Sequence, residues 1–137
     1  EGGHRVPAIA NWPGRITPGR VTSETALTMD LLPTLLAITG VPRPTGLRLD
    51  GVDLSGVLFR GESLAPRSLF WRDSDEKAVR RGPWKWVARG AKAELFNLSD
   101  DVGENHDLVA ARPELARQLQ GEVAAWERDV KPVEAAR

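Results

Sequence analysis

The pattern of apolar and polar positions changes near Arg67. Before this residue, short apolar groups are separated by prolines and glycines. After it, short alternating segments follow one another, and a longer periodic segment comes last. Alternation with a period of two is typical of strands, and recurrence every three or four residues is typical of helices. The second half of the chain is therefore predicted to contain several strands followed by a helix.

A short strand is predicted near the beginning, over residues 4–12. Val6, Ile9 and Trp12 stand among small residues there, which is a weak alternation. The dipeptide Pro13-Gly14 follows, and this pair is typical of turns. The pattern thus predicts a strand that ends in a surface turn.

The segment TMDLLPTLLAITG predicts a helix over residues 30–39. Asp30 can cap the free amide groups of the first turn, and Pro33 falls where a missing N–H is harmless. Gly40 supplies the end of the helix. Because its leucines leave the helix apolar on more than one side, it is predicted to be a core helix.

Four short strands are predicted after Arg67. Their sequences are SLFWR, KAVRR, PWKWVAR and AELFNL, and turn residues separate them at the spacing of an antiparallel meander. In the third strand, Trp84 and Trp86 fall on one face, while Lys85 and Val87 fall on the other. The tryptophan face is therefore predicted to be packed, and it needs a covering element.

That cover is predicted to be a helix over residues 113–130. Pro113 suits a first-turn position. Apolar residues recur at intervals of three and four along the segment and form a single stripe: Leu115, Leu119, Val123, Trp126 and Val130. Residues 131–137 are predicted to be a frayed tail.

Composition excludes several classes of function. The chain has 137 residues, enough to bury a real core, and its 19 basic and 19 acidic side chains give a formal net charge of zero. No global field therefore attracts nucleic acid or an anionic membrane. No apolar run approaches the roughly 20 residues of a membrane helix. The absence of cysteine excludes disulfides, thiolate metal sites and cysteine nucleophiles within this sequence.

A group of basic residues lies on the predicted strands, interleaved with tryptophans. Its members are Arg80, Arg81, Lys85, Arg89 and Lys92. Basic and aromatic residues together are found in single-stranded nucleic-acid sites. The zero net charge and the core-like alternation of the tryptophans argue against that function, so no nucleic-acid partner is expected.

The two histidines, His4 and His106, are about a hundred positions apart. This separation argues against a histidine metal cluster formed by this chain alone. His106 lies in DDVGENHDL, a composition typical of turns, and the acidic segment lacks the ligand spacing of a calcium loop. His4 follows two glycines and precedes Arg5. It fits either a site at the mouth of a strand or a structural loop in which Glu1 pairs with Arg5.

Taken in order, several segments resemble the C-terminal part of the sulfatases. They include EGGHRVP, MDLLPTLL, LDGVDL, KAVRRGPWKWV and ELFNLSDDVGENHDL. The resemblance covers the chain from Glu1 to about Trp126, and it depends on many motifs in one order. It is strongest for the arylsulfatase and N-acetylgalactosamine-6-sulfatase-like branch.

The resemblance implies an α/β fold of the alkaline-phosphatase type with a smaller α+β subdomain, in which a four-stranded antiparallel sheet packs on a long terminal helix. Residues 1–61 would then be the end of the large domain, residues 62–130 the subdomain and residues 131–137 a tail. The chain would pack on an N-terminal sulfatase domain that it lacks. In that case the helix over residues 30–39 would expose an apolar surface.

The resemblance also implies the chemistry of sulfate ester hydrolysis. Sulfatases use a formylglycine made within a Cys/Ser-x-Pro-x-Arg motif, beside a divalent cation, usually calcium, that Asp and Asn residues hold. In this chain the similar segment Ser63 to Arg67 has its proline one position late. The nucleophile, the calcium ligands and a sulfate-binding lysine would lie upstream of Glu1. No catalytic or metal-binding residue is assigned here, and this chain alone is expected to be inactive.

The resemblance implies that this chain supplies only residues that line the substrate pocket. His4 is a candidate contact with a sulfated sugar, and Arg5 is either a second contact or the structural partner of an acidic group. The expected substrates are sulfated carbohydrates or aryl sulfates. No membrane partner is expected.

Two other functions stay open on the sequence. One is the hydrolysis of phosphoryl or phosphonate esters by an enzyme of the same superfamily. The other is a non-catalytic module that binds anionic glycans. The residues of this chain do not indicate a localisation, and the resemblance implies a periplasmic or extracellular enzyme.

Overall fold

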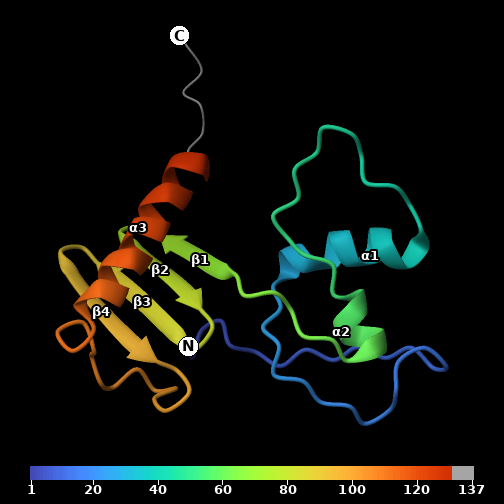
Figure 1. Cartoon of the computed structure of the whole chain (residues 1–137), viewed down its shortest axis with the longest axis horizontal. Helices are drawn as coiled ribbons and strands as arrows, with labels where there is room; N and C mark the ends of the chain where they lie inside the picture. Colours follow the sequence, from blue (N-terminus) through green and yellow to red (C-terminus); the bar gives the residue numbers. More distant parts are fainter. Residues whose placement is uncertain (131–137) are drawn as a thin grey trace. The chain divides into compact units, whose positions relative to one another are not determined.

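The computed structural model describes residues 1–130, in two compact units. One unit, here called the sheet unit, consists of Glu1–Val6 and the chain from Pro66 onward. The other, here called the helical unit, consists of Pro7–Ala65. Figure 1 shows the strands of the first unit and the short helices of the second. The predicted tail, residues 131–137, lies outside the described residues.

The sheet unit contains a four-stranded antiparallel sheet in the order β1-β2-β3-β4. The strands are β1 (Ser68–Asp73), β2 (Glu76–Arg81), β3 (Trp84–Arg89) and β4 (Lys92–Asn97). Two-residue turns join them, and three of the turn residues, Ser74, Gly82 and Gly90, have a positive φ of 52 to 56°. Such φ values match the twist of tight hairpins. The predicted meander is confirmed.

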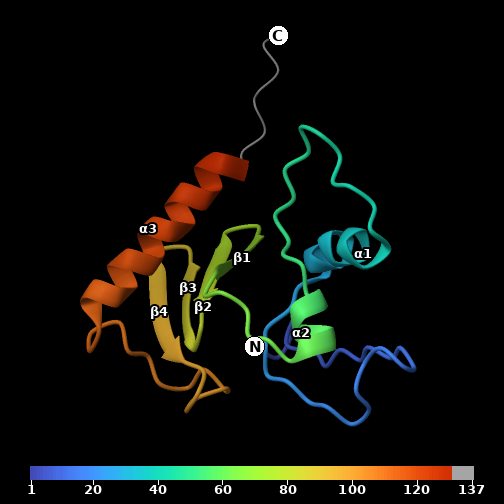
Figure 2. The ribbon, with the colours of Figure 1, turned by 45° about the vertical axis from the view of Figure 1, so that its right-hand side comes forward.

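Helix α3 (Pro113–Val130) covers one face of this sheet, as Figure 2 shows. Its buried residues Leu119 and Val123 pack with residues from three strands into one core: Val79, Trp86 and Leu95. Phe70 of β1 and Trp126 of α3 stack with their ring centroids 5.2 Å apart. The predicted stripe on the helix and the predicted tryptophan face therefore meet.

The opposite face of the sheet carries a smaller apolar cluster. Val87, Phe96 and Leu98 are buried there. Lys85 projects from β3 on the same face as Val87, because strand residues two apart share a side of the sheet. We call this side the second face, and the candidate site lies on it.

The helical unit contains a 3-10 turn (Thr28–Asp30), α1 (Leu31–Thr39) and α2 (Ser55–Arg60). Helix α1 and its end at Gly40, with a φ of 70°, are as predicted. The predicted capping role of Asp30 is wrong, because its side chain makes no capping bond to α1. Its buried carboxylate instead accepts from the backbone N–H groups of Leu27, at 2.7 Å, and Val52, at 2.9 Å.

The predicted strand over residues 4–12 is also wrong. This segment is not a strand and finds no partner strand among residues 1–130. A strand forms by pairing its backbone groups with a neighbour, and weak alternation does not supply one. The turn that follows is confirmed, since Arg15 and Ile16 donate to the carbonyl of Trp12 at 3.0 and 2.9 Å.

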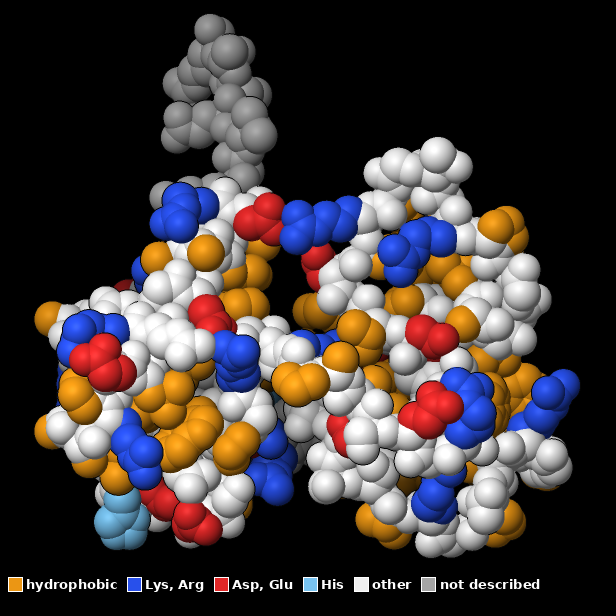
Figure 3. Space-filling view, viewed as in Figure 1, with side chains coloured by type: hydrophobic (Ala, Val, Ile, Leu, Met, Phe, Trp, Pro, Cys, Tyr) orange, Lys and Arg blue, Asp and Glu red, His pale blue; other side chains and the backbone are white. Residues whose placement is uncertain are grey.

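Helix α1 leaves much of its apolar surface uncovered. Leu31, Leu32 and Leu35 are 57%, 48% and 57% exposed, whereas Pro33 and Thr34 are buried. Apolar side chains reach the surface of both units in Figure 3. Within the described residues α1 is thus not a core helix, because much of its apolar surface is exposed. No helix among residues 1–130 has the length and apolar character needed to cross a membrane.

We expect Leu119→Ala to lower the free energy of unfolding of the sheet unit by about 2 to 5 kcal/mol, because the side chain is 0% exposed and its removal leaves a cavity. Urea unfolding followed by tryptophan fluorescence measures this change. Gln120→Ala is the matched control, since Gln120 is exposed on the same helix. Equal stability of the two variants would contradict the packing described here.

Candidate functional site

The first residues of the chain lie on the second face of the sheet. They form a tight turn in which the backbone N–H groups of His4 and Arg5 donate to the carbonyl of Glu1, at 3.2 and 2.9 Å. Gly2 and Gly3 lie inside this turn, where no heavy atom comes within 4 Å of the position of an added Cβ. We call Glu1–Arg5 the N-terminal turn. Its place on the sheet depends on the side chain of Glu1.

The carboxylate of Glu1 is buried, with only 2% of the side chain exposed. Its Oε2 lies 3.3 Å from Nη1 of Arg80, and its Oε1 lies 3.3 Å from Nζ of Lys85. Arg80 and Lys85 are direct neighbours across β2 and β3. Glu1 therefore bridges two adjacent strands from above the sheet.

Lys85 completes a cluster of four charges. Its Nζ donates to Oε1 of Glu104 at 2.7 Å, and its side chain is 5% exposed. The backbone nitrogen of Glu1 also contacts Glu104. The two cations Arg80 and Lys85 and the two carboxylates of Glu1 and Glu104 make up what we call the charge cluster.

The charge cluster favours the ionised forms of Glu1, Glu104 and Lys85 through their pKa values. Burial raises the pKa of the Glu1 carboxyl, but the positive charges of Lys85 and Arg80 outweigh burial, so the pKa lies below its ordinary value. The pKa of Glu104 is lowered against burial by the hydrogen bond from Lys85. Burial lowers the pKa of Lys85, yet the hydrogen bond to Glu104 and the nearby carboxylates raise it overall.

His4 lies between the charge cluster and an aromatic side chain. Its ring stacks on Trp71 with the centroids 4.7 Å apart, and its Nε2 lies 3.3 Å from Oε1 of Glu1. Burial and the positive charge of Lys85 lower the pKa of the imidazole, while Glu1 opposes them. The neutral form of His4 is thus favoured in the folded protein.

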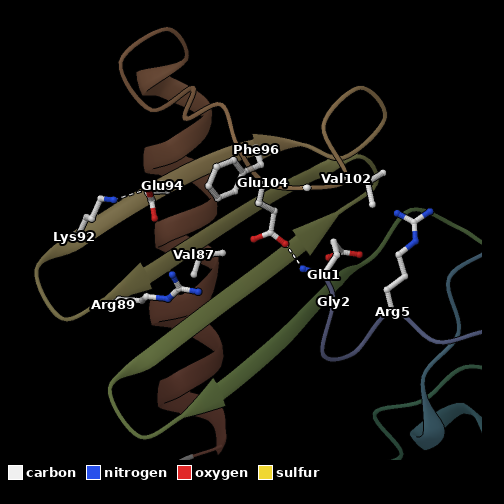
Figure 4. A pocket seen from close by; sticks show the side chains of 11 residues that line it. Glu1, Gly2, Arg5, Val87, Arg89, Lys92, Glu94, Phe96, Val102 and Glu104 are labelled. Atoms are coloured by element: carbon white, nitrogen blue, oxygen red, sulfur yellow. Dashed lines mark hydrogen bonds and ion pairs between the residues drawn. The ribbon is translucent and has the colours of Figure 1, made fainter.

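A cleft of about 770 Å³ opens beside the N-terminal turn, on the second face. Val87 and Phe96 belong to its lining, together with charged residues (Figure 4). Three cations line it: Arg5, Arg89 and Lys92. Arg89 pairs with Glu76 at 3.1 Å, and Lys92 pairs with Glu94 at 2.7 Å.

Arg5 differs from the other two cations of the cleft. Its side chain makes no hydrogen bond or ion pair with any of residues 1–130, and it is exposed. In Figure 4 its guanidinium lies across the cleft from Lys92. Within the part of the chain that the structure describes, Arg5 is thus a positive charge at the cleft without a carboxylate partner, which suits an anionic ligand.

The two sequence-predicted site residues thus take different places. Arg5 lines the cleft, whereas His4 is not among the lining residues and stacks on Trp71. The pairing of Glu1 with Arg5, one of the alternatives above, is absent among the described residues, because Glu1 pairs with Arg80, Lys85 and His4.

Sequence reasoning missed the charge cluster. The available signal was Lys85, a lysine in the middle of a strand between two tryptophans, on the face that also carries Val87. A buried lysine requires a carboxylate partner. Nothing in the local sequence indicates that Glu1 and Glu104 are those partners, since they are 84 and 19 positions away.

His106 and the basic group on the strands make contacts that stabilise the fold. His106 is exposed in a turn where its backbone N–H and that of Asn105 each donate to Asp101 at 2.8 Å, as predicted. Those bonds lower the pKa of Asp101. The basic group on the strands is divided between the two faces: Arg81 pairs with Glu122 of α3 at 2.8 Å, while the others face the second side.

The described residues do not suit a metal ion. Among residues 1–130, no group of three or more His, Cys, Asp or Glu side chains could hold one. A calcium ion takes six to eight oxygen ligands. No step of a reaction at calcium is therefore assigned to these residues.

Similar proteins were found among curated sequences and solved structures, although no family model matches the chain. Arylsulfatase G of Rattus norvegicus is 38% identical over 143 residues, which covers 87% of this chain and 27% of that protein. Arylsulfatase A of Homo sapiens is 41% identical over 139 residues, covering 80% of this chain and 27% of that protein. The chain thus spans about a quarter of the length of these relatives.

The crystal structure of Ps i-CgsB is similar in fold, with a TM-score of 0.75 at 24% identity over 88% of this chain and 28% of that chain. The same protein has been solved in complex with k-i-k-neocarrahexaose. The 2-O GAG sulfatase BT1596 has a TM-score of 0.57 at 21% identity over 73% of this chain and 24% of that chain. These likenesses confirm the predicted fold class.

We expect acidification to destabilise the wild-type sheet unit more than a His4→Phe variant. The pKa of His4 is depressed in the folded state, so the stability it contributes is present above the ordinary value of 6.5 and is lost as pH falls through the folded value. Phenylalanine can still stack on Trp71 but does not titrate. Urea unfolding between pH 8 and pH 5 measures the difference.

Gln120→Ala is the control for this experiment, because Gln120 is exposed on α3 and does not titrate. Its stability should change with pH as that of the wild type does. A His4→Phe variant whose stability falls with pH as steeply as that of the wild type would contradict the stacked, neutral imidazole.

Proposed function

The chain belongs to the sulfatase family, and from this we propose that it is the C-terminal portion of an enzyme that hydrolyses sulfate esters of carbohydrates or aryl alcohols. The observation that carries the proposal is the identity of 38% and 41% to two arylsulfatases over 87% and 80% of the chain. The complex of the similar Ps i-CgsB with k-i-k-neocarrahexaose supports a carbohydrate as the part of the substrate that bears the sulfate ester. In this proposal the sulfuric ester hydrolase activity is that of the full-length enzyme, of which this chain is one portion.

In this proposal Arg5 and His4 form the part of the substrate site that this chain supplies. A sulfated substrate is an anion, and the side chain of Arg5 lines the cleft without a partner among residues 1–130. The guanidinium offers several donors in a fixed plane to sulfate or carboxylate oxygens. His4, whose neutral ring stacks on Trp71, would meet the sugar side of the substrate.

The reaction chemistry would come from the rest of the enzyme. In sulfatases, formylglycine supplies the nucleophile and a divalent cation stabilises charge on the sulfate oxygens. The chain contains no cysteine, and residues 1–130 hold no group suited to a metal. This chain would therefore bind and orient the substrate without attacking it.

The rival functions are not favoured. A phosphoryl or phosphonate ester hydrolase would share the large domain, and a glycan-binding module would share the basic strands. The relatives described above carry the names arylsulfatase A and arylsulfatase G. The basic side chains Arg80, Arg81 and Lys85 are, moreover, paired with carboxylates within the sheet unit.

We also propose that the exposed leucines of α1 are covered by the N-terminal part of the sulfatase. Leu31 and Leu35 lie one helical turn apart and are both 57% exposed. Relatives about four times as long as this chain have ample sequence to cover them. Residues 1–61 would complete the large domain, and residues 62–130 would form the C-terminal subdomain.

The activity is tested by assaying the full-length protein with an aryl sulfate and with sulfated oligosaccharides, alongside the 137-residue chain. We expect turnover by the former and none by the latter. Arg5→Gln in the full-length enzyme should lower kcat/KM by about tenfold to a hundredfold, the effect of losing one charged hydrogen bond to the substrate. His4→Ala should raise KM or lower kcat for sulfated sugars.

Arg43→Gln is the control for these variants, because Arg43 is exposed and lies in the helical unit. Its kinetics should match the wild type. Unchanged kinetics in Arg5→Gln would remove Arg5 from the substrate site. Hydrolysis of phosphate esters in preference to sulfate esters would reject the proposed function.

The covering of α1 predicts a stability change that depends on the rest of the protein. Leu35→Ala should cost about 2 to 5 kcal/mol in the full-length enzyme, where the side chain would be buried, and little in the isolated chain. Urea unfolding of both proteins measures this difference. Leu119→Ala is the control, since it should destabilise both, and an equal effect of Leu35→Ala in both would contradict the covering.

A further inference from the structure

We infer that Lys85 is a positioning residue, which holds the N-terminal turn on the second face of the sheet and so sets where Arg5 stands at the cleft. The inference rests on the proposed function for its effect on catalysis. Its structural part, the anchoring of the turn, rests only on contacts within the sheet unit.

The first step is the burial of Lys85. It is the only buried cation that the structure describes among residues 1–130, with 4% of the residue exposed. A charge withdrawn from water is costly unless carboxylates lie close by. Lys85 lies within ion-pair distance of two, Glu104 at 2.7 Å and Glu1 at 3.3 Å.

The second step is the balance of the cluster. Arg80 and Lys85 supply two positive charges, and Glu1 and Glu104 supply two negative ones. If Lys85 became neutral, Glu104 would lose the cation that lies 2.7 Å from it, and Glu1 would keep Arg80 alone, at 3.3 Å. Both carboxylates lie within 3.3 Å of the Lys85 nitrogen, so without its charge they would repel each other, and this repulsion would weaken the attachment of the N-terminal turn that contains Glu1.

The third step connects Glu1 to Arg5. The carbonyl of Glu1 accepts the backbone N–H of Arg5 at 2.9 Å, so the two residues belong to one hydrogen-bonded turn. The side chain of Arg5 has no partner of its own among the described residues, and nothing else in the sheet unit fixes its guanidinium. Figure 4 shows the contact between the backbone nitrogen of Glu1 and the carboxylate of Glu104, and both residues line the cleft together with Arg5.

The fourth step distinguishes the anchoring of the N-terminal turn by Lys85 from a contribution of Lys85 to the stability of the main core. The main core, which includes Val79, Leu95 and Leu119, lies on the other face of the sheet, against α3. Loss of Lys85 should therefore release the N-terminal turn while the sheet and α3 stay folded. A residue that only stabilised the fold would affect both together.

The anchoring is tested by hydrogen exchange and mass spectrometry on the full-length protein. In Lys85→Met we expect faster exchange in the peptide that contains His4 and Arg5, with no change in the peptides of α3. Lys85→Arg, which keeps the charge, should restore protection. The control is Arg81→Gln, which removes the ion pair to Glu122 on the opposite face and should leave the turn protected.

The catalytic consequence is tested by kinetics of the same variants with a sulfated substrate. Lys85→Met should lower kcat/KM about tenfold or more, mainly through KM, and Arg81→Gln should leave it within about twofold. The kcat/KM of the double variant Lys85→Met/Arg5→Gln should be no lower than that of the less active single variant. Both substitutions remove the same contact with the substrate, so their effects should not add. Additive losses would overturn the inference.

Failure of the inference can be told apart from failure of the proposed function. If the full-length protein hydrolyses no sulfate ester, the proposed function fails, and hydrogen exchange still decides whether Lys85 holds the turn. Unchanged exchange in Lys85→Met overturns the inference in either case. If exchange in α3 shows that Lys85→Met does not fold, Glu104→Gln removes the second carboxylate partner of Lys85 and is subject to the same criteria.

Discussion

The alternation of side chains along β3 is the constraint on which the sheet unit depends. Trp84 and Trp86 point to one face, and Lys85 and Val87 point to the other. The apolar stripe of α3 covers the tryptophan face, and this packing requires only a complementary shape and apolar side chains. The second face contains a lysine, so it can be closed only by groups that carry negative charge. A shift of one residue in the register of β3 would exchange these faces and leave both without a fitting cover.

The parts that could be predicted from the sequence are those governed by local periodicity. The four strands, their turns and α3 follow from alternation, turn residues and a stripe at three and four positions. The parts that could not be predicted depend on distant partners. Asp30 looks like a helix cap, yet its carboxylate binds the backbone of Val52, which is 22 positions away. The segment 4–12 alternates like a strand but has no neighbour to pair with among the described residues.

The candidate site shows the same division between local and distant information. Arg5 could be selected from the sequence because it follows two glycines and a histidine near an expected loop. The buried position of Glu1 could not, because it follows from Arg80 and Lys85, about 80 residues later. The resemblance to sulfatases made this segment a candidate, whereas the ion pairs that hold it on the sheet emerge only from the folded chain. Family likeness thus proposed the segment, and electrostatics explains its geometry.

The pairing of charges also explains why Arg5 suits a ligand. The chain has as many acidic as basic residues, and the cations that line the second face have carboxylate partners: Arg80 with Glu1, Lys85 with Glu104, Arg89 with Glu76 and Lys92 with Glu94. Glu1 could have neutralised Arg5, four residues along the chain. Because Arg80 and Lys85 hold the carboxylate of Glu1 inside the cluster, it does not pair with Arg5. The buried ion pairs therefore do more than attach the turn to the sheet, since they leave Arg5 at the cleft without a carboxylate partner among residues 1–130.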